Sequence, residues 1–358
     1  MAFSGSYDPT DVTFLLKPVE LAPTSLEAKE VLIQSGRRHY SEMISREAPP
    51  SPEYQRIFAA AQERNGLRFA QDLLRLAATI AERRSGPLTL VSLARAGTPV
   101  GVILTRILRN RYQREVNHYS ISIIRDRGID TQALAWILAR HPAASLVFLD
   151  GWTGKGVIAR ELAKYLTVFN HDRTEAVPTE LFVVADLAGF ADYAASFEDY
   201  LIPSGILGAT ISGLVSRSIL NYEVLGPDDF HGCLELVELA PYDLSRQFAD
   251  QITSLALDSL AIPDSLSHPR AELREQSRAF LAEIARRYQI TDQNRIKPGI
   301  AEATRVLLRR VPDLLLVRDP ADRDVDHALV LARERSVPIE VSPWLPYRAA
   351  ALIAARGQ

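Results

Sequence analysis

Short apolar segments alternate with helical segments through the middle of this chain, and this alternation restricts its fold more than any other feature. The apolar segments predict four strands, at residues 88–93, 119–124, 145–149 and 181–187. Helical patterns separate them, at residues 99–109, 131–140 and 157–168. Strands that alternate with helices of 10–15 residues form parallel sheets with crossover helices. The sequence therefore predicts an α/β fold whose ligands bind beyond the carboxyl ends of the strands.

The segments on either side of this alternation predict a second, smaller unit. Residues 1–50 are loop-rich, a helix is expected over 53–83, and a loop with a short helix over 201–220. The further expected elements are a linker at 261–269, helices at 271–288, 300–310, 324–333 and 347–355, and strands at 313–318 and 338–341. We therefore divide the chain into a main domain at 1–260, a linker and helix at 261–290, and a small α/β domain at 291–358.

Composition excludes several classes of protein. With 47% hydrophobic and 24% charged residues, the chain is an ordinary globular protein rather than a disordered one. A net charge of −3 shows no global excess of the basic residues that bind nucleic acid. A single cysteine, Cys233, rules out an intrachain disulfide and fits a reducing compartment. No secretory signal and no apolar segment of about 20 residues is found, so we expect a cytoplasmic protein; an oligomer remains open.

A glycine-rich turn follows the strand at 145–149. The sequence there is LDGWTGKG, with Asp150 at the strand end and Thr153, Gly154, Lys155 and Gly156 before the next helix. Free amides at a helix N-terminus bind anions, and glycine allows the backbone to approach closely. The spacing fits neither a P-loop nor a dinucleotide fingerprint. An anion site and a plain glycine-rich turn without a ligand are both open at this point.

A second turn follows the strand at 88–93, in LARAGTP. Thr98 suits a helix N-cap and Pro99 the first helical turn. The planar guanidinium of Arg95 could bind a phosphate in bidentate fashion, although a solvated loop arginine is the simpler alternative. Because parallel strands end at one edge of the sheet, the two turns are expected to lie together.

This pair of turns resembles the phosphoribosyltransferase superfamily. LARAGTP is similar to the loop that binds pyrophosphate, and LDGWTGKG to the loop that binds ribose 5-phosphate, with one acidic residue where that family usually has two. The longer segments SYDPTDVTFLL, GRRHYSEM, HYSISIIRDRGID, EDYLIPSGILGATISGLVSRS and FHGCLELVELAPYDLSR resemble the StiP family over residues 6 to about 255. That family is associated with bacterial tellurite-resistance and stress genes, and is described both as phosphoribosyltransferase-like and as a cysteine protease.

The resemblance implies a Rossmannoid phosphoribosyltransferase-like domain that acts on phosphoribosyl pyrophosphate, or a related nucleotide, with Mg²⁺. Asp150 would contact the ribose or the metal. The phosphates would be bound by residues of both turns: Arg95, Ala96, Gly97, Thr98, Thr153, Gly154, Lys155 and Gly156. Arg125 or Arg127, in a charged turn after the strand at 119–124, could stabilise the leaving pyrophosphate; a solvated turn is an equal alternative.

The C-terminal segment resembles a PELOTA-type RNA-binding domain, in PGIAEATRVLLRRVPDLLLVRD and VPIEVSPWLPYRAAALI. Arg305, Arg309 and Arg310 on one expected helix could meet RNA phosphates, or form a solvent-exposed salt-bridged face. A non-catalytic RNA- or nucleotide-binding factor is therefore a further hypothesis.

A cysteine protease is the remaining alternative. It needs a thiol, an imidazole and an oxyanion hole. Cys233 is the sole thiol, and His231 would share its face of a strand. A buried, inert cysteine beside a structural histidine explains the same pattern.

Overall fold

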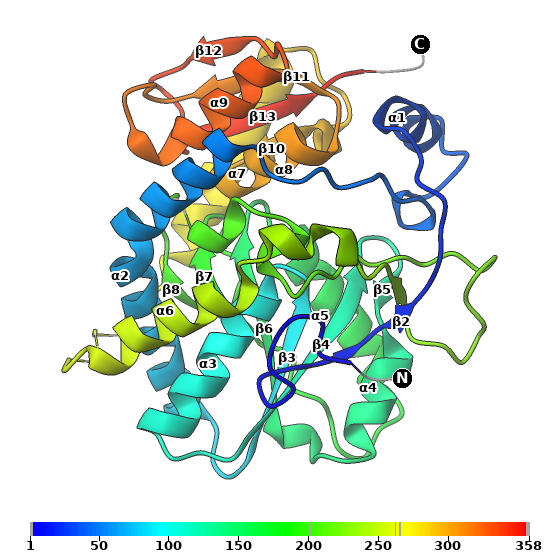
Figure 1. Cartoon of the computed structure of the whole chain (residues 1–358), viewed down its shortest axis with the longest axis vertical. Coiled ribbons are helices and arrows are strands. Elements are labelled where there is room, and N and C mark those ends of the chain that lie inside the picture. Colours follow the sequence, from blue (N-terminus) through cyan, green and yellow to red (C-terminus); the bar gives the residue numbers. More distant parts are fainter. Residues whose placement is uncertain (1–2, 201, 262, 265, 356–358) are drawn as a thin grey trace.

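The computed structural model describes residues 3–200, 202–261, 263–264 and 266–355. A seven-stranded sheet forms the centre of its larger part (Figure 1). Its strand order is β1-β4-β3-β6-β7-β8, all parallel, with β5 antiparallel to β4. The strands are β1 (Thr13–Leu15), β3 (Leu88–Ala94), β4 (Val116–Ile124), β5 (Gly128–Ile129), β6 (Leu146–Thr153), β7 (Leu181–Asp186) and β8 (Tyr193–Ser196). The predicted parallel α/β sheet is therefore confirmed.

Helices cover both faces of this sheet, which explains why its strands are continuous apolar segments. One face packs against α2 (Pro52–Arg83), α3 (Gly97–Arg111) and α6 (Ser245–Asp258). The other face packs against α4 (Thr131–Leu138) and α5 (Val157–Asn170). No described helix is both long and apolar enough to span a membrane.

The first 50 residues contain β1, β2 (Lys17–Pro18), which pairs with β9 (Gly232–Cys233), and α1 (Leu26–Gln34). After α1 the chain crosses the molecule to the start of α2 (Figure 1). We call residues 44–51 of this crossing the strap. The strap runs between the larger part of the protein and the C-terminal unit.

The C-terminal unit is a second α/β structure with a four-stranded sheet of order β10-β13-β11-β12. Its elements are α7 (Arg270–Arg287), β10 (Ile296–Pro298), α8 (Ile300–Arg309), β11 (Pro312–Val317), α9 (Asp326–Glu334), β12 (Ile339–Val341) and β13 (Ala349–Ile353). The helix predicted over 347–355 is wrong, because residues 349–353 form the fully buried strand β13 between β10 and β11. Burial between two strands overrides the helix propensity of its alanines.

The two units share one hydrophobic core. Ile300, Val306 and Leu307 of α8 belong to the same buried cluster as Ile202 and Ile206 of the larger unit. The half-buried Asp199 carboxylate accepts hydrogen bonds from the amides of Ile300 and Arg348, at 2.9 and 2.8 Å. The C-terminal unit is thereby fixed over the carboxyl edge of the large sheet.

Candidate active site

The two glycine-containing turns touch each other, as predicted. Strands β3 and β6 are neighbours, with Ser92 opposite Leu149. A Cβ atom at Gly97 would lie 2.5 Å from the carbonyl oxygen of Leu149, and one at Gly151 would lie 3.3 Å from that of Ala96. Glycine at position 97 therefore allows an approach that no side chain would permit.

The turn after β6 is shorter than the sequence indicates. The strand extends through Thr153, whose hydroxyl donates a hydrogen bond to the buried carboxylate of Asp186. Gly154, Lys155 and Gly156 form the turn proper, and Gly156 has a left-handed φ of +70° immediately before α5. No side chain caps this helix, so its first-turn amides can bind an anion.

A cavity of about 290 Å³ lies over this turn, between the two units of the protein. Its lining includes the carboxylates of Asp150 and Glu302. It also includes eight cationic side chains, which come from α1, the β4–β5 turn, the β6–α5 turn, the segment after Gly213, β10 and α8: Lys29, Arg125, Lys155, Arg217, Lys297, Arg305, Arg309 and Arg310. The cavity is therefore strongly positive in a protein whose net charge is negative.

Three of these cations lack a direct partner. Among the described residues, the ends of Lys29, Lys297 and Arg309 form no hydrogen bond or salt bridge, although Lys29 is buried. Burial and neighbouring cations lower the pKa of Lys29 to about 7 and that of Arg309 to about 9, against the opposing effects of Glu30 and Glu47 respectively. The pKa of Lys297 is lowered for the same reasons, despite the opposing effect of Glu302. Lys297 and Arg309 are half-buried. A charge that is shielded from water without a direct partner is costly, so this cavity is suited to an anionic ligand.

The remaining cations are already held in place. The guanidinium of Arg310 forms two 2.7 Å hydrogen bonds with the Glu30 carboxylate. Arg305 donates to Glu302 at 2.9 Å and stacks over the Trp152 ring. Lys155 donates to the carbonyl oxygens of residues 293 and 296, and burial lowers its pKa to about 7.

Asp150 lies in this cavity, within β6 rather than at its tip. It accepts a hydrogen bond from the amide of Gly151 at 2.7 Å. Burial raises its pKa to about 7, against the opposing effects of Arg305 and the Gly151 amide. A carboxyl group that titrates near neutral pH can bind a hydroxyl group either as a donor or as an acceptor.

The turn after β3 is closed by the strap. Arg95, predicted to be free for phosphate, is 7% exposed. Its guanidinium contacts the Glu47 carboxylate at 2.6 Å and the Val215 carbonyl oxygen at 2.8 Å. Arg95 and Ala96 line a residual cavity of about 20 Å³. Glu47 thus binds the guanidinium that was expected to bind a phosphate.

The predicted N-cap at Thr98 is wrong. Helix α3 starts at Gly97 after an Ala96 cap, and the Thr98 hydroxyl hydrogen-bonds Ser120 inside the protein. The helix therefore begins two residues before the predicted first-turn Pro99.

The charged turn after β4 separates its two arginines. Arg125 lines the cationic cavity, donates to Asp126 and contacts the Asn294 side chain at 3.3 Å. Arg127 is exposed, pairs with Glu42 at 3.3 Å and does not line that cavity. The turn joins β4 to β5 in a tight antiparallel hairpin.

Cys233 and His231 do not form a catalytic pair. Cys233 is fully buried in the hydrophobic core, and burial together with Glu235 raises the pKa of its thiol to about 12. The His231 imidazole instead hydrogen-bonds the Ser122 hydroxyl at 2.7 Å, and its amide donates to Asp130. No hydrogen bond joins His231 to Cys233 in the described structure.

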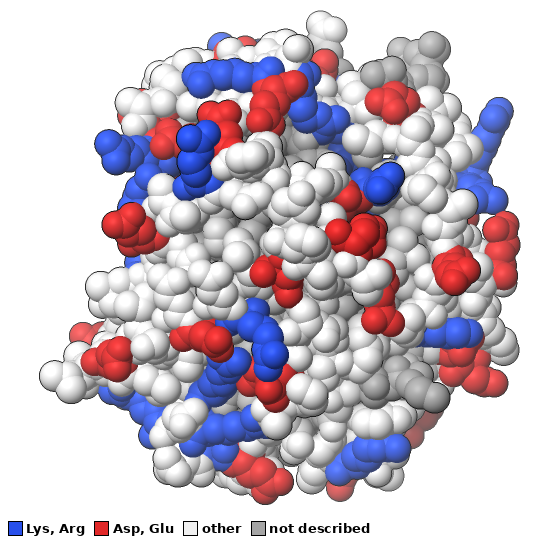
Figure 2. Space-filling model, viewed as in Figure 1, with Lys and Arg blue, Asp and Glu red and all other residues white. Residues whose placement is uncertain are grey.

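The three C-terminal arginines face inward. Arg305, Arg309 and Arg310 all line the cationic cavity, so they meet the β6–α5 turn instead of forming an outer basic surface. Figure 2 shows acidic and basic residues interspersed on the face in view. Sequence reasoning missed Lys29, Arg217 and Lys297, which are distant from both glycine-containing turns in the sequence and have no local motif.

Fold and site define an α/β protein whose cationic cavity lies at the carboxyl edge of a parallel sheet, beneath a second α/β unit. The chain belongs to the StiP family, because the model described as "Tellurite-like stress resistance cysteine protease StiP" matches residues 5–253. The PELOTA RNA-binding domain model matches residues 275–355. A relative from Acinetobacter baylyi, named cysteine protease StiP, is 44% identical over 99% of this chain and 95% of its own.

Solved phosphoribosyltransferases resemble part of the chain at low identity. The hypoxanthine phosphoribosyltransferase of Trypanosoma cruzi is 15% identical, with a TM-score of 0.28, over 36% of this chain and 77% of its own. An HPRT in which an invariant aspartate is replaced by glutamine is 15% identical, with a TM-score of 0.29, over 48% of this chain and 94% of its own. These values are too low to support an argument about activity.

Proposed function

We propose that this protein binds phosphoribosyl pyrophosphate, or a related nucleotide, in the cationic cavity and transfers its phosphoribosyl group. The observation that carries the proposal is the set of unpaired cations, Lys29, Lys297 and Arg309, around a carboxylate and a helix N-terminus. A phosphorylated sugar supplies both the negative charge that these cations lack and hydroxyl groups for Asp150.

In this proposal the chain's own residues mainly bind and neutralise charge. Lys155 and the first amides of α5 would bind the 5-phosphate, and Asp150 would contact ribose hydroxyls. The bond from the sugar C1 atom to pyrophosphate breaks, and a bond from C1 to a nitrogen of the acceptor forms. If that nitrogen carries a hydrogen, its proton passes to the departing pyrophosphate or to water. Arg125 and Lys297 would stabilise the negative charge that develops on the departing pyrophosphate.

Mg²⁺ fits this site only together with a ligand. The described residues contain no group of three or more acidic, histidine or cysteine side chains that could hold a metal. Mg²⁺ is commonly bound by one or two carboxylates plus substrate phosphates, and Asp150 offers such a carboxylate. When bound, the metal would add charge neutralisation at the phosphates.

Calorimetric titration with phosphoribosyl pyrophosphate and Mg²⁺ tests this function. We expect saturable binding that is weakened by Asp150→Asn and by Lys155→Ala. Lys164→Ala is the matched control, because Lys164 is an exposed lysine on α5 outside the cavity. Absence of binding, or equal affinity in all variants, would overturn the proposal. Pyrophosphate release in the presence of acceptor bases would separate an enzyme from a non-catalytic nucleotide-binding factor.

The name of the Acinetobacter baylyi relative favours a second candidate, peptide hydrolysis by Cys233. A buried thiol of raised pKa is a poor nucleophile, so this candidate requires an opening of the core around β9. Loss of peptidase activity in Cys233→Ala would support it, whereas retained activity would exclude this thiol as the nucleophile.

The PELOTA match favours RNA as a further candidate partner. Because Arg305, Arg309 and Arg310 face the cavity, we propose that they contact the phosphates of a nucleotide or a single RNA end rather than a duplex. Equal affinity for a short RNA in wild type and Arg309→Gln would contradict this role.

A further inference from the structure

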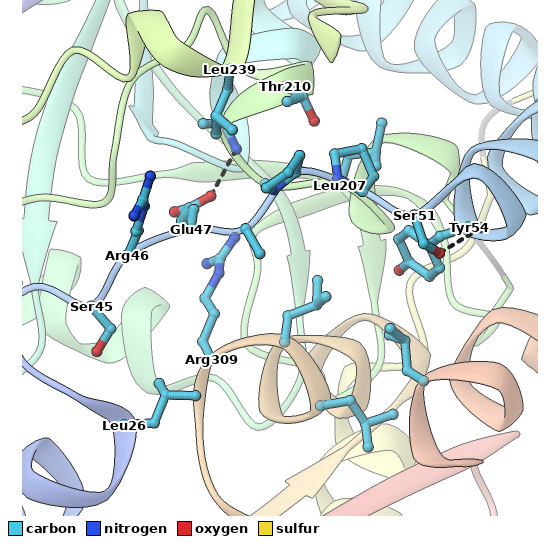
Figure 3. A pocket seen from close by; sticks show the side chains of 18 of the residues that line it. Leu26, Ser45, Arg46, Glu47, Ser51, Tyr54, Leu207, Thr210, Leu239 and Arg309 are labelled. Carbon is cyan, nitrogen blue, oxygen red and sulfur yellow. Dashed lines mark hydrogen bonds between the residues drawn. The ribbon is translucent and has the colours of Figure 1, made fainter. Parts of the chain in front are cut away.

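A second cavity, of about 390 Å³, lies beside the cationic cavity. We call it the strap cavity, because the strap forms one of its walls. The segment 206–210, Leu239 and the helices α8 and α9 complete it, as Figure 3 shows around Leu207, Leu239 and Arg309. Its volume falls in the range of small-molecule binding sites.

The walls of the strap cavity are largely apolar. They include side chains from the strap, the 206–210 segment, the segment 237–242, α8 and α9: Ile44, Pro49, Leu207, Leu239, Leu307 and Leu331. Such walls favour a ligand with an apolar body, because burial of apolar surface in a preformed cavity is favourable.

One end of the strap cavity is cationic. Lys29, Arg217 and Arg309 line both this cavity and the cationic cavity, so the two compartments meet at these three side chains. The Glu47 carboxylate also faces the strap cavity, but the Arg95 guanidinium and the Ala209 amide already bind it, at 2.6 and 3.1 Å. Glu47 also acts on Arg309 at longer range, but the ends of Lys29 and Arg309 form no hydrogen bond or salt bridge within the described part of the chain, so cationic groups remain open to a ligand at this end.

A buried hydroxyl also lacks a partner here. The Oγ atom of Ser45, which lines the strap cavity, is inaccessible to water and has no hydrogen bond within the described part of the chain. Buried polar atoms are nearly always hydrogen-bonded, so each exception calls for an explanation. Because this atom is inaccessible to water, a ligand would bond to it only if the strap around Ser45 moved.

We propose that the strap cavity binds a second small molecule, a carboxylic acid with an apolar body that carries the accepting nitrogen, whose carboxylate lies against Lys29 and Arg309. The inference rests on the proposed function, since transfer of a phosphoribosyl group needs an acceptor. The shared cations would bring the acidic end of the acceptor beside the phosphates of the donor.

The test uses 1-naphthoate as a probe of the strap cavity and sulfate as a probe of the cationic cavity, each titrated by calorimetry. Ala48→Trp fills the strap cavity from its exposed edge, because Ala48 is an exposed residue of the strap that lines it. Ala282→Trp is the matched control, since Ala282 is an exposed alanine on α7 that lines neither cavity. Circular dichroism establishes that each variant is folded.

We expect 1-naphthoate to bind at one site, and Ala48→Trp to weaken this binding at least about tenfold while Ala282→Trp leaves it unchanged. The uncharged analogue 1-naphthamide should bind at least about tenfold more weakly, because charge-assisted contacts are lost. Sulfate affinity should be the same in Ala48→Trp and wild type.

Equal 1-naphthoate affinity in Ala48→Trp and wild type, equal affinity for the amide, or no binding of either would overturn the strap-cavity proposal. Sulfate binding that Lys155→Ala weakens would meanwhile leave the proposed function intact. If sulfate does not bind to the wild-type protein, this result would count against the proposed function itself.

Discussion

The contact between Glu47 and Arg95 predicts a specific loss of stability when its charge is removed. The Glu47 side chain is 17% exposed and the Arg95 side chain 5%. Burial alone would raise the pKa of Glu47, but the positive charges of Arg95 and Arg309 outweigh this effect and lower it. The resulting pKa is about 2, against an ordinary 4.5. This difference of about 2.5 units corresponds to roughly 3 kcal/mol of folding free energy, within the range for breaking a buried ion pair.

Urea denaturation of wild type and Glu47→Gln at pH 7 measures this loss, which we expect to be about 3 kcal/mol. Glu63→Gln, an exposed glutamate of α2, is the control and should change stability by less than about 0.5 kcal/mol. The double variant Glu47→Gln/Arg95→Met should lose less than the sum of the single variants, because both partners of the buried pair are then removed.

The pH dependence of this loss has a definite sign. Because folding lowers the pKa of Glu47, its contribution is fully present above about pH 4.5 and declines as pH falls towards 2. The gap between wild type and Glu47→Gln should shrink by about 1.4 kcal/mol per pH unit below pH 4.5. A gap near zero at pH 7, or one that does not change between pH 6 and pH 3.5, would refute the reasoning.

Three further predictions follow from the site. Sulfate keeps its charge between pH 6 and 9, so any change in its affinity over this range comes from the protein. The affinity measured by calorimetry should fall above pH 7 as Lys29 and Lys155 lose their protons, by up to about tenfold per pH unit for each lysine. Lys155→Arg should make the affinity depend less on pH. Gly156→Ala should lower the free energy of unfolding, measured by urea denaturation, by about 1–3 kcal/mol, because its Cβ would lie 2.2 Å from the Phe190 ring. Gly36→Ala is the control and should lower it less, because Gly36 also has a positive φ but no neighbour within reach of a Cβ. Equal losses in the two variants would argue against the clash. The Cys233 thiol should resist a disulfide reagent in the native protein and react after denaturation, and rapid native reaction would contradict its burial.

Much of the fold could be predicted because its signals are local. The apolar segments and helical periods between residues 88 and 187 correspond closely to β3, α3, β4, α4, β6, α5 and β7. Their order also implied that the two turns meet, since parallel strands end at one edge. Residues 349–353 lacked such a signal, because an alanine-rich segment favours a helix until it is buried between two strands.

The site was less predictable because distant segments complete it. Lys29 lies on α1 and Lys297 on β10, and nothing in the sequence around either residue indicates that the two line one cavity. Arg95 has the residue type that binds phosphate, but the strap brings Glu47 to it from 48 positions away. Arg305, Arg309 and Arg310 were predicted on one helix face, whereas the direction of that face depends on how α8 packs over the large sheet.

A crystal structure of the protein soaked with phosphoribosyl pyrophosphate and Mg²⁺ tests the central claim most directly. The account predicts density for a phosphate at the first amides of α5, within hydrogen-bonding distance of Lys155, and a sugar hydroxyl at Asp150. Density for the ligand outside the cavity, or a cavity without ligand at a saturating concentration, would contradict it.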